Sequence, residues 1–460
     1  MSDVNITTPT TTRAGRRRLG GRWIDDWRPE DGEFWNRIGK TVARRNLIYS
    51  VFSEHIGFSI WSVWSVLVLF LGPDYGFDPV QKFLLTAAPT LVGALLRLPY
   101  TFAVGKFGGR NWTIVAALLL LVPSIMIAIV LKPGVSFNTL LIVSLFAGVG
   151  GGNFASSMTN INTFYPARLK GWALGVNAGG GNLGVPAVQL VGLLVLATLG
   201  TQHPRAVIAI YIPLIILATI GAVMKMDNLS VNSNSKGAIR EVSRHSQTWI
   251  MSLLYIGTFG SFIGFGFAFG QVLLVQFPEQ FPQPVKAAAL TFLGPLLGSL
   301  IRPFGGALAD RFKGSVVTFL NFIAMAIGAL VVLGASQINS LPLFIVGFVM
   351  LFVFSGIGNG STYKMIPAIF HAKAQLEVGA GLDLAEADHR AIRRAGALIG
   401  LAGAVGALGG VMVNLAFRQS FLTLQNGDGA YIAFIAYYVV CCLVTWVVFI
   451  RQRPGRLLGV

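Results

Sequence analysis

About twelve stretches of roughly 20 mainly apolar residues follow one another along this chain, and each is long enough to cross a bilayer core of about 30 Å as a helix. The composition agrees with this pattern, because 54% of the 460 residues are hydrophobic and only 12% are charged, too apolar for a soluble protein of this size. The sequence therefore predicts an all-α membrane protein with twelve transmembrane helices. These are expected to begin near Leu47, Phe83, Trp112, Phe137, Trp172, Val207, Trp249, Leu290, Val316, Leu343, Ala397 and Tyr431.

The formal net charge of +17 would suggest a nucleic-acid partner if it lay on a soluble surface. Its distribution indicates a different cause. With the N-terminus placed inside the cell, the cytoplasmic segments hold 27 of the 35 Lys and Arg residues, and the opposite segments hold five. Because this asymmetry follows the positive-inside rule, we expect both termini in the cytoplasm and a multi-pass protein of the inner (cytoplasmic) membrane. The basic segments are expected to contact anionic membrane lipids, and no nucleic-acid partner is expected.

A polar stretch at residues 226–246 divides six spans from six. The two halves also share a motif, since "RLPYTFAVGKFGG" from Arg97 and "RPFGGALADRFKG" from Arg302 match at a constant offset of 205 residues. Such a parallel repeat is typical of transporters built from two equivalent bundles. The expected segments are a cytoplasmic tail with a juxtamembrane segment (1–46), a six-helix bundle (47–225), a cytoplasmic linker (226–246), a second six-helix bundle (247–450) and a cytoplasmic tail (451–460).

Three segments outside the spans carry further expectations. Residues 1–34 have the polar and charged composition of a disordered tail. The stretch "GEFWNRIGKTVARRNL" is predicted to be an amphipathic segment on the membrane surface. The acid-rich insert at 371–396 is predicted to form a surface helix, and whether it has a gating role is left open.

Four charged side chains fall within the predicted spans, namely Arg97, Arg302, Lys364 and Glu54. An arginine in mid-membrane costs about 2.5 to 3.5 kcal/mol on insertion scales, so it should face the bundle interior. One such arginine could bind helix carbonyls or a buried acid. Two arginines at equivalent positions of both halves lack matching acids, so an anion from solution is the natural counter-ion. A guanidinium donates parallel hydrogen bonds that suit a small planar oxyanion, although phosphate or organic carboxylates also satisfy such a pair.

The fifth span opens with "GWALGVNAGGGNLG", in which six glycines permit close approach of neighbouring helices. The same stretch contains Asn177 and Asn182, whose amide groups need hydrogen-bond partners in an apolar environment. We therefore expect this span to pack tightly and to place polar groups in the bundle interior.

Several motifs together resemble the nitrate/nitrite porter family of the major facilitator superfamily. They are "ALGVNAGGGNLG", "GGGNFASSMTNINTFYP", "GALLRLPY", "SLLYIGTFGSFIGF", "GNGSTYKMIP" and the glycine-rich "GLAGAVGALGG" at 400–410. The turn "GGALADRFKG" is similar to the superfamily's loop between the second and third helices, whereas the first-half copy "VGKFGGR" has Gly105 in place of an aspartate. The resemblance implies the major facilitator fold.

The resemblance also implies a site and a function. Arg97 and Arg302 would clamp the anion from opposite halves, and Tyr255 would supply a hydroxyl. Phe154 and Phe259 would cover the two faces of the anion, with Asn177 and Asn182 nearby. The substrates would be nitrate and nitrite, moved by alternating access. We expect the protein to work as a monomer.

The coupling mode stays open at this point. Exchange of nitrate for nitrite is favoured because an empty site with two arginines should reorient slowly, whereas Glu54 or His55 could instead couple nitrate entry to protons. Lys364 could pair with Glu54 or His55, or extend to the cytoplasmic end of its span.

A gated anion channel is a weaker alternative because no ring of charge is evident. The spans lack the clustered His, Asp, Glu or Cys of an enzyme, and no cofactor or metal is expected.

Overall fold

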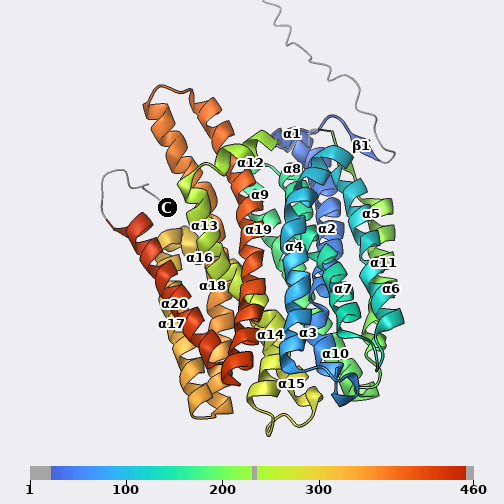
Figure 1. Ribbon diagram of the computed structural model, residues 1–460. Helices are drawn as coiled ribbons and strands as arrows, with labels where there is room; N and C mark the ends of the chain where they lie inside the picture. The colour runs from blue at the N-terminus through green and yellow to red at the C-terminus, as the bar shows by residue number, and fades with distance from the viewer. Residues whose placement is uncertain (1–21, 231–235, 452–460) are drawn as a thin grey trace, which may run out of the picture.

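The computed structural model describes residues 22–230 and 236–451, and within them twelve helical spans are long and apolar enough to cross a membrane (Figure 1). The predicted number of spans is confirmed. The N-terminal half contains α2 (Lys40–Ser62) with α3 (Trp64–Phe70), α4 (Pro79–Phe107), α5 (Gly109–Leu119) with α6 (Leu121–Val130), α7 (Phe137–Ala147) with η3 (Gly148–Gly152) and α8 (Asn153–Phe164), α9 (Ala167–Asn182) with α10 (Gly184–Leu199), and α11 (Arg205–Lys225).

The C-terminal half repeats this arrangement beside the first (Figure 1). It contains α13 (Ser246–Tyr255) with η4 (Ile256–Gly260) and α14 (Ser261–Gln276), α15 (Pro284–Thr291) with α16 (Leu293–Phe312), α17 (Gly314–Gln337), α18 (Leu341–Gly379), α19 (Leu384–Leu424), and α20 (Asp428–Thr445) with η5 (Trp446–Ile450). Helix α4 of the first half packs along α19 of the second, so these two helices form much of the interface between the halves.

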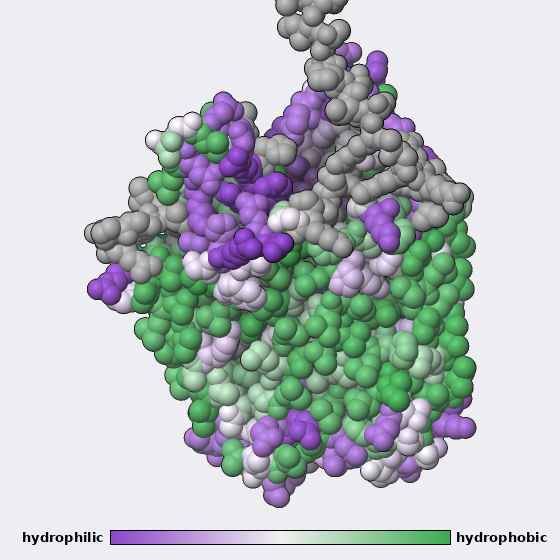
Figure 2. Space-filling model, turned by 45° about the horizontal axis from the view of Figure 1, so that its top comes forward, coloured by the Kyte–Doolittle hydropathy of each residue, from purple (hydrophilic) through white to green (hydrophobic). Residues whose placement is uncertain are grey.

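The outer surface follows the hydropathy of a membrane protein. In the face shown in Figure 2, a broad hydrophobic band lies between polar residues at the two ends of the bundle. Leu194, Leu300 and Ile129 are each at least 60% exposed although they are large and apolar. Such a surface is stable only against lipid, which accounts for the side chains that no other helix covers.

The repeat predicted at an offset of 205 residues is visible in the backbone. Helix α4 ends at Phe107 and α16 at Phe312, and the next residues, Gly108 and Lys313, have similar backbone conformations with positive φ of 89° and 72°. The following helices then begin at Gly109 and Gly314. Equivalent positions therefore end and restart a helix in the same way, and they fix Arg97 and Arg302 at equivalent depths.

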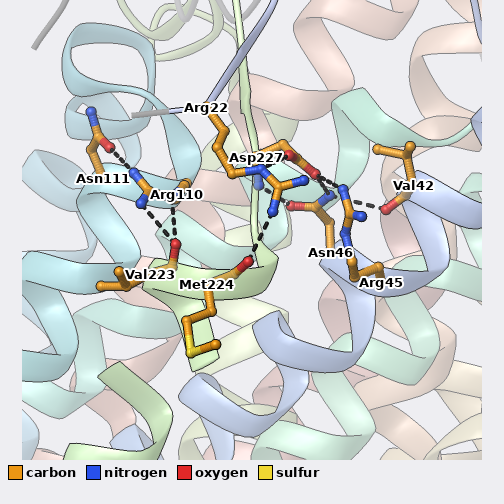
Figure 3. Close-up of polar contacts among 9 residues, drawn as sticks. All are labelled: Arg22, Val42, Arg45, Asn46, Arg110, Asn111, Val223, Met224 and Asp227. Carbon is orange, nitrogen blue, oxygen red and sulfur yellow. Dashed lines mark hydrogen bonds and ion pairs between the residues drawn. The ribbon is translucent and has the colours of Figure 1, made fainter. Parts of the chain in front are cut away.

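The end of the bundle that carries the short strands, α12 (Lys236–Val242) and the tips of α18 and α19 is called the terminal face (top of Figure 1). Here β1 (Trp23–Ile24) pairs in parallel with β2 (Asn228–Leu229). The buried carboxylate of Asp227 binds Arg22 at 3.0 Å and Arg45 at 2.5 Å, and accepts a hydrogen bond from Asn46 at 2.9 Å (Figure 3). The first strand is thereby tied to the first and sixth spans.

These contacts change two expectations about the N-terminal region. The prediction of a disordered tail is wrong for residues 22–34, which form β1 and a helical turn α1 (Gly32–Phe34); residues 1–21 lie outside the described part of the chain. The stretch predicted to lie on the membrane surface instead continues through η1 (Trp35–Gly39) into α2 as one helical segment. Its apolar residues Trp35, Ala43 and Leu47 are buried in a hydrophobic cluster of the protein and do not face lipid.

The acid-rich insert also differs from a separate surface helix. Helices α18 and α19 both extend beyond the bundle at the terminal face and form a helical hairpin there (Figure 1). The hairpin is tied to α12, because Arg394 and Arg393 of α19 bind Glu241 at 2.6 and 2.8 Å. Arg394 also joins the two arms of the hairpin, since it binds Glu377 of α18 at 2.6 Å.

Candidate anion site between the two halves

Arg97 lies in the interior of α4 and is fully buried. Its Nη1 donates a hydrogen bond of 2.8 Å to the carbonyl of Gly403 on α19, and its Nε donates one of 3.3 Å to the carbonyl of Gly151 in η3. Its Nη2 is buried without a hydrogen-bond partner among the described residues. The guanidinium is therefore held across the interface between the halves and keeps one donor free.

Aromatic rings surround this guanidinium. Its carbon Cζ lies 4.7 Å from the ring centre of Phe154 on α8, 4.8 Å from that of Phe259 in η4 and 5.5 Å from that of Trp61 on α2. The rings of Phe154 and Phe259 are 6.1 Å apart and close to parallel, at 28°. The electron-rich faces stabilise the cation while they exclude water from it.

The seventh span places two site residues through a local irregularity. Its helix changes from α to π geometry at Ile256–Gly260, directly after Tyr255. The rings of Tyr255 and Phe259 stack at 5.2 Å and 12°, so both point toward the same region. Single π-helical turns are frequent at functional sites because they re-aim side chains. Gly406 on α19 leaves the room for the Tyr255 ring, since a Cβ at this position would lie 2.5 Å from it.

Arg302, on α16, approaches from the C-terminal half. It is 7% exposed, and its Nη1 is buried without a partner among the described residues. Its Cζ lies 5.6 Å from the ring centre of Tyr363 on α18, and the rings of Tyr363 and Tyr255 are 6.1 Å apart. Arg302 and Arg97 are near enough to repel each other electrostatically. The structure thus places the two arginines, Tyr255, Phe154 and Phe259 near one another, and the anion-binding role that the resemblance implies for them stays a prediction.

Four donors at this place lack a hydrogen-bond acceptor in the described part of the protein. They are Nη2 of Arg97, Nη1 of Arg302 and the hydroxyls of Tyr255 and Tyr363. A buried donor without a partner costs about 1 to 3 kcal/mol, and more if it is charged. Four such donors, two of them cationic, form an arrangement that a bound oxyanion would satisfy.

A cavity of about 230 Å³ leads away from these residues. Arg97, Phe154 and Tyr363 line it on the side of the arginine pair, and Ile239 of α12 and Arg393 of α19 line it toward the terminal face. Thr101, Thr159 and Asn162 add polar groups along its wall. Arg97 can therefore be reached from the terminal face in this conformation, whereas Arg302 is not among the residues that line the cavity.

Glu54 lies on α2, buried at 1% exposure and close enough to both arginines to attract them. Its Oε2 accepts hydrogen bonds from the hydroxyl of Ser157 and, at 2.5 Å, from the amide of Asn177. Its other oxygen, Oε1, is buried without a partner among the described residues. Gly181 of α9 makes room for this carboxyl, because a Cβ there would lie 2.6 Å from the carboxyl carbon. The ionisable groups at the centre of the site therefore include one carboxyl group and two guanidinium groups.

The remaining sequence candidates are placed as follows. The ring Nδ1 of His55 lies 3.1 Å from the carbonyl oxygen of Gly180, beside the fifth span. Asn182 is buried, and neither of its amide atoms has a hydrogen-bond partner among the described residues. Lys364 binds Asp310 at 2.9 Å and is partly exposed, so of the two alternatives the pairing with Glu54 or His55 is not seen, and extension to the cytoplasmic end of the span stays a prediction.

Three residues of the site were not singled out from the sequence. Trp61 borders Arg97, Ser157 binds Glu54, and Tyr363 contacts Arg302. Ser157 and Tyr363 stand inside motifs quoted above, so the motifs carried a signal for them. Trp61 has no such signal, because one of nine tryptophans in an apolar span is unremarkable.

Comparison with known proteins agrees with this geometry. The pattern that describes the Major Facilitator Superfamily matches residues 52–413. A crystal structure of a bacterial homologue of the human lysosomal transporter Spinster, inward-facing and unoccupied, superposes with a TM-score of 0.65 at 16% identity, over 90% of this chain and 100% of that one. The fold, its two halves and the central site therefore define a member of the major facilitator superfamily.

Two relatives narrow the class. The nitrate/nitrite transporter NarU of Escherichia coli (strain K12) is 38% identical over 453 residues, which cover 94% of this chain and 96% of NarU. The probable nitrate/nitrite antiporter NarK2 of Thermus thermophilus is 32% identical over 468 residues, covering 95% of this chain and 98% of NarK2. This chain belongs to the nitrate/nitrite porter family of the superfamily.

Proposed function

We propose that this protein transports nitrate and nitrite across the cytoplasmic membrane by alternating access of one site to the two faces. The observation that carries the proposal is the set of four buried donors without acceptors, two of them arginine groups from opposite halves. A monovalent planar oxyanion offers several acceptor oxygens and one negative charge to such a set. The names of the relatives support nitrate and nitrite as the substrates.

In this proposal the terminal face points to the cytoplasm and the protein works as a monomer. The excess of Lys and Arg at segments of this face supports the orientation. The cavity between Arg97 and Arg393 is then the path to the cytoplasm, and the conformation faces inward. No catalytic chemistry is needed, because the substrate leaves unchanged.

The aromatic pair is assigned to substrate selection. Phe154 and Phe259 would cover the anion's faces. Their near-parallel rings stand 6.1 Å apart, less than the roughly 7 Å that two stacking contacts need, so the rings would separate to admit a flat anion and would have to separate further for a tetrahedral one. Asn177 acts through Glu54, to which it donates, and Asn182 supplies a further amide near the site.

Uptake into proteoliposomes tests the function. Purified protein should move nitrate and nitrite saturably into vesicles loaded with the other anion, and sulfate or phosphate should compete weakly. Equal uptake into vesicles without protein, or stronger competition by sulfate than by nitrite, would contradict the proposal.

Exchange of nitrate for nitrite is the proposed mode, and the position of Glu54 favours one second candidate, a proton-coupled nitrate symporter. Its carboxyl is buried beside both arginines and has one oxygen without a partner, so a proton bound there would alter the charge of the site. In a symporter, an inward proton gradient should drive nitrate into anion-free vesicles, and Glu54→Gln should abolish this drive. The exposed acid Glu279 provides a control in Glu279→Gln.

A further inference from the structure

Tyr363 combines features that the aromatic core of this protein does not share. It lies on α18, its ring borders the cavity that contains Arg97, and it is half-buried. Its hydroxyl oxygen is nevertheless shielded from solvent and has no hydrogen-bond partner among the described residues. A tyrosine hydroxyl in such a position normally finds a partner, because desolvation of the group is costly.

The surroundings of the hydroxyl indicate what the missing partner is. The Tyr363 ring lies 5.6 Å from the guanidinium carbon of Arg302 and 6.1 Å from the ring of Tyr255, and Arg97 is near enough to interact with it electrostatically. Two cations and a second hydroxyl around it favour a negatively charged acceptor. A neutral acceptor would leave the two arginines with no counter-charge beyond the single carboxyl group of Glu54.

We propose that Tyr363 is a substrate-contacting residue whose hydroxyl donates a hydrogen bond to an oxygen of the bound nitrate. The assignment rests on the proposed function, since it identifies a further ligand of the same site. Tyr255 and Tyr363 then present two hydroxyls from the C-terminal half, and Arg97 approaches from the other half. The ring of Tyr363 has a separate role, because it packs against the Arg302 guanidinium and limits its movement.

Tyr363→Phe tests the hydroxyl alone, because the variant keeps the ring beside Arg302. Loss of a hydrogen bond to a charged ligand should raise the KM for nitrate about tenfold or more, with a smaller effect on the maximal rate. The matched control is Tyr431→Phe, which removes another buried hydroxyl without a partner in the described structure, on α20 among Phe344, Phe348 and Phe417. This control should leave the KM unchanged.

Nitrate-induced thermal stabilisation of the purified variants provides a second readout that does not depend on transport. The midpoint of the stabilisation should move to about tenfold higher nitrate in Tyr363→Phe and not in Tyr431→Phe. If wild-type protein neither transports nitrate nor is stabilised by it, the proposed function fails, and this assignment fails with it. If the wild type does both while Tyr363→Phe keeps the same KM and midpoint, only the assignment of Tyr363 is overturned.

Discussion

An arginine inside a membrane can have a structural role or a substrate-binding role, and the contacts of Arg97 are compatible with both. One explanation is structural, and the hydrogen bonds to the carbonyls of Gly151 and Gly403 agree with it. The other is substrate binding, and the unpaired Nη2 agrees with that. A guanidinium has five N–H donors in a rigid plane, so one side can anchor two helices while the other binds an anion.

Replacement of either site arginine by lysine separates charge from geometry. Arg97→Lys and Arg302→Lys keep the cation and lose the planar fork, so we expect nitrate uptake to fall at least about tenfold in each. Arg205→Lys is the control, because Arg205 also donates to a backbone carbonyl, that of Leu131 at 2.9 Å, outside the site. Near-normal uptake by either site variant would show that a point charge suffices.

The phenylalanine pair should determine which anions are excluded. In Phe154→Ala or Phe259→Ala the loss of a ring widens the site and admits water, so sulfate and phosphate should compete with nitrate about tenfold better than in wild type. Phe344→Ala removes an equally buried ring from an aromatic cluster of the C-terminal half and controls for loss of stability. Unchanged selectivity in both site variants would assign these rings to ordinary packing.

At the scale of elements, sequence patterns predicted the features that depend on local composition or on the internal repeat. Span length and apolar content predicted the twelve helices, and the 205-residue repeat predicted equivalent arginines. The pairing of β1 with β2 was not predictable, because it joins two-residue segments about 200 positions apart. The position of Lys364 was uncertain because α18 has 39 residues and extends past the apolar band, so hydropathy alone does not show where the bilayer ends. Tyr363 was missed because the face on which a helical residue points depends on packing.

The contacts between α12 and the hairpin predict a pH-dependent attachment at the terminal face. Partial burial alone would raise the pKa of Glu241, but the hydrogen bond and charge of Arg394, with the charge of Arg393, outweigh it and bring the pKa below its usual value. His245 also lies nearby. A lowered pKa means that Glu241 stabilises the folded protein above its unfolded pKa of about 4.3, and that this stabilisation is lost as the pH falls through the folded value.

Glu241→Gln should therefore lower thermal stability in detergent at pH 7, by on the order of 1 kcal/mol because the pairs are partly exposed. The difference from wild type should shrink as the pH falls below about 4.3 and vanish once the pH is well below the lowered pKa of the folded carboxyl. Glu279→Gln, an exposed acid on the chain between α14 and α15, should show neither effect. A difference that does not shrink as the pH falls would mean that the ion pairs are not its cause.

At the scale of the whole molecule, the two halves meet at a site whose charge changes with its occupant. With Glu54 ionised, the empty site has a net charge of +1 from two arginines and one carboxylate, and a bound monovalent anion brings it to zero. Closure of the helices lowers the effective dielectric constant, so uncompensated charge is most costly in the occluded state that each reorientation must cross. The loaded carrier should therefore reorient faster than the empty one, which is the condition for exchange.

The last prediction follows from this charge balance and uses Glu54 to shift it. Wild-type protein should take up nitrate faster into nitrite-loaded vesicles than into anion-free ones at a clamped voltage. At a pH at which Glu54 is ionised, Glu54→Gln removes the carboxylate that attracts both arginines and leaves the empty site at +2, so closure of the empty site becomes more costly. Return of the empty carrier should then slow, while exchange, in which the site is always loaded, should slow less. The ratio of exchange to net uptake should rise in the variant. Equal wild-type uptake into both kinds of vesicle would contradict exchange, and a ratio that falls in Glu54→Gln would show that site charge does not limit the empty return.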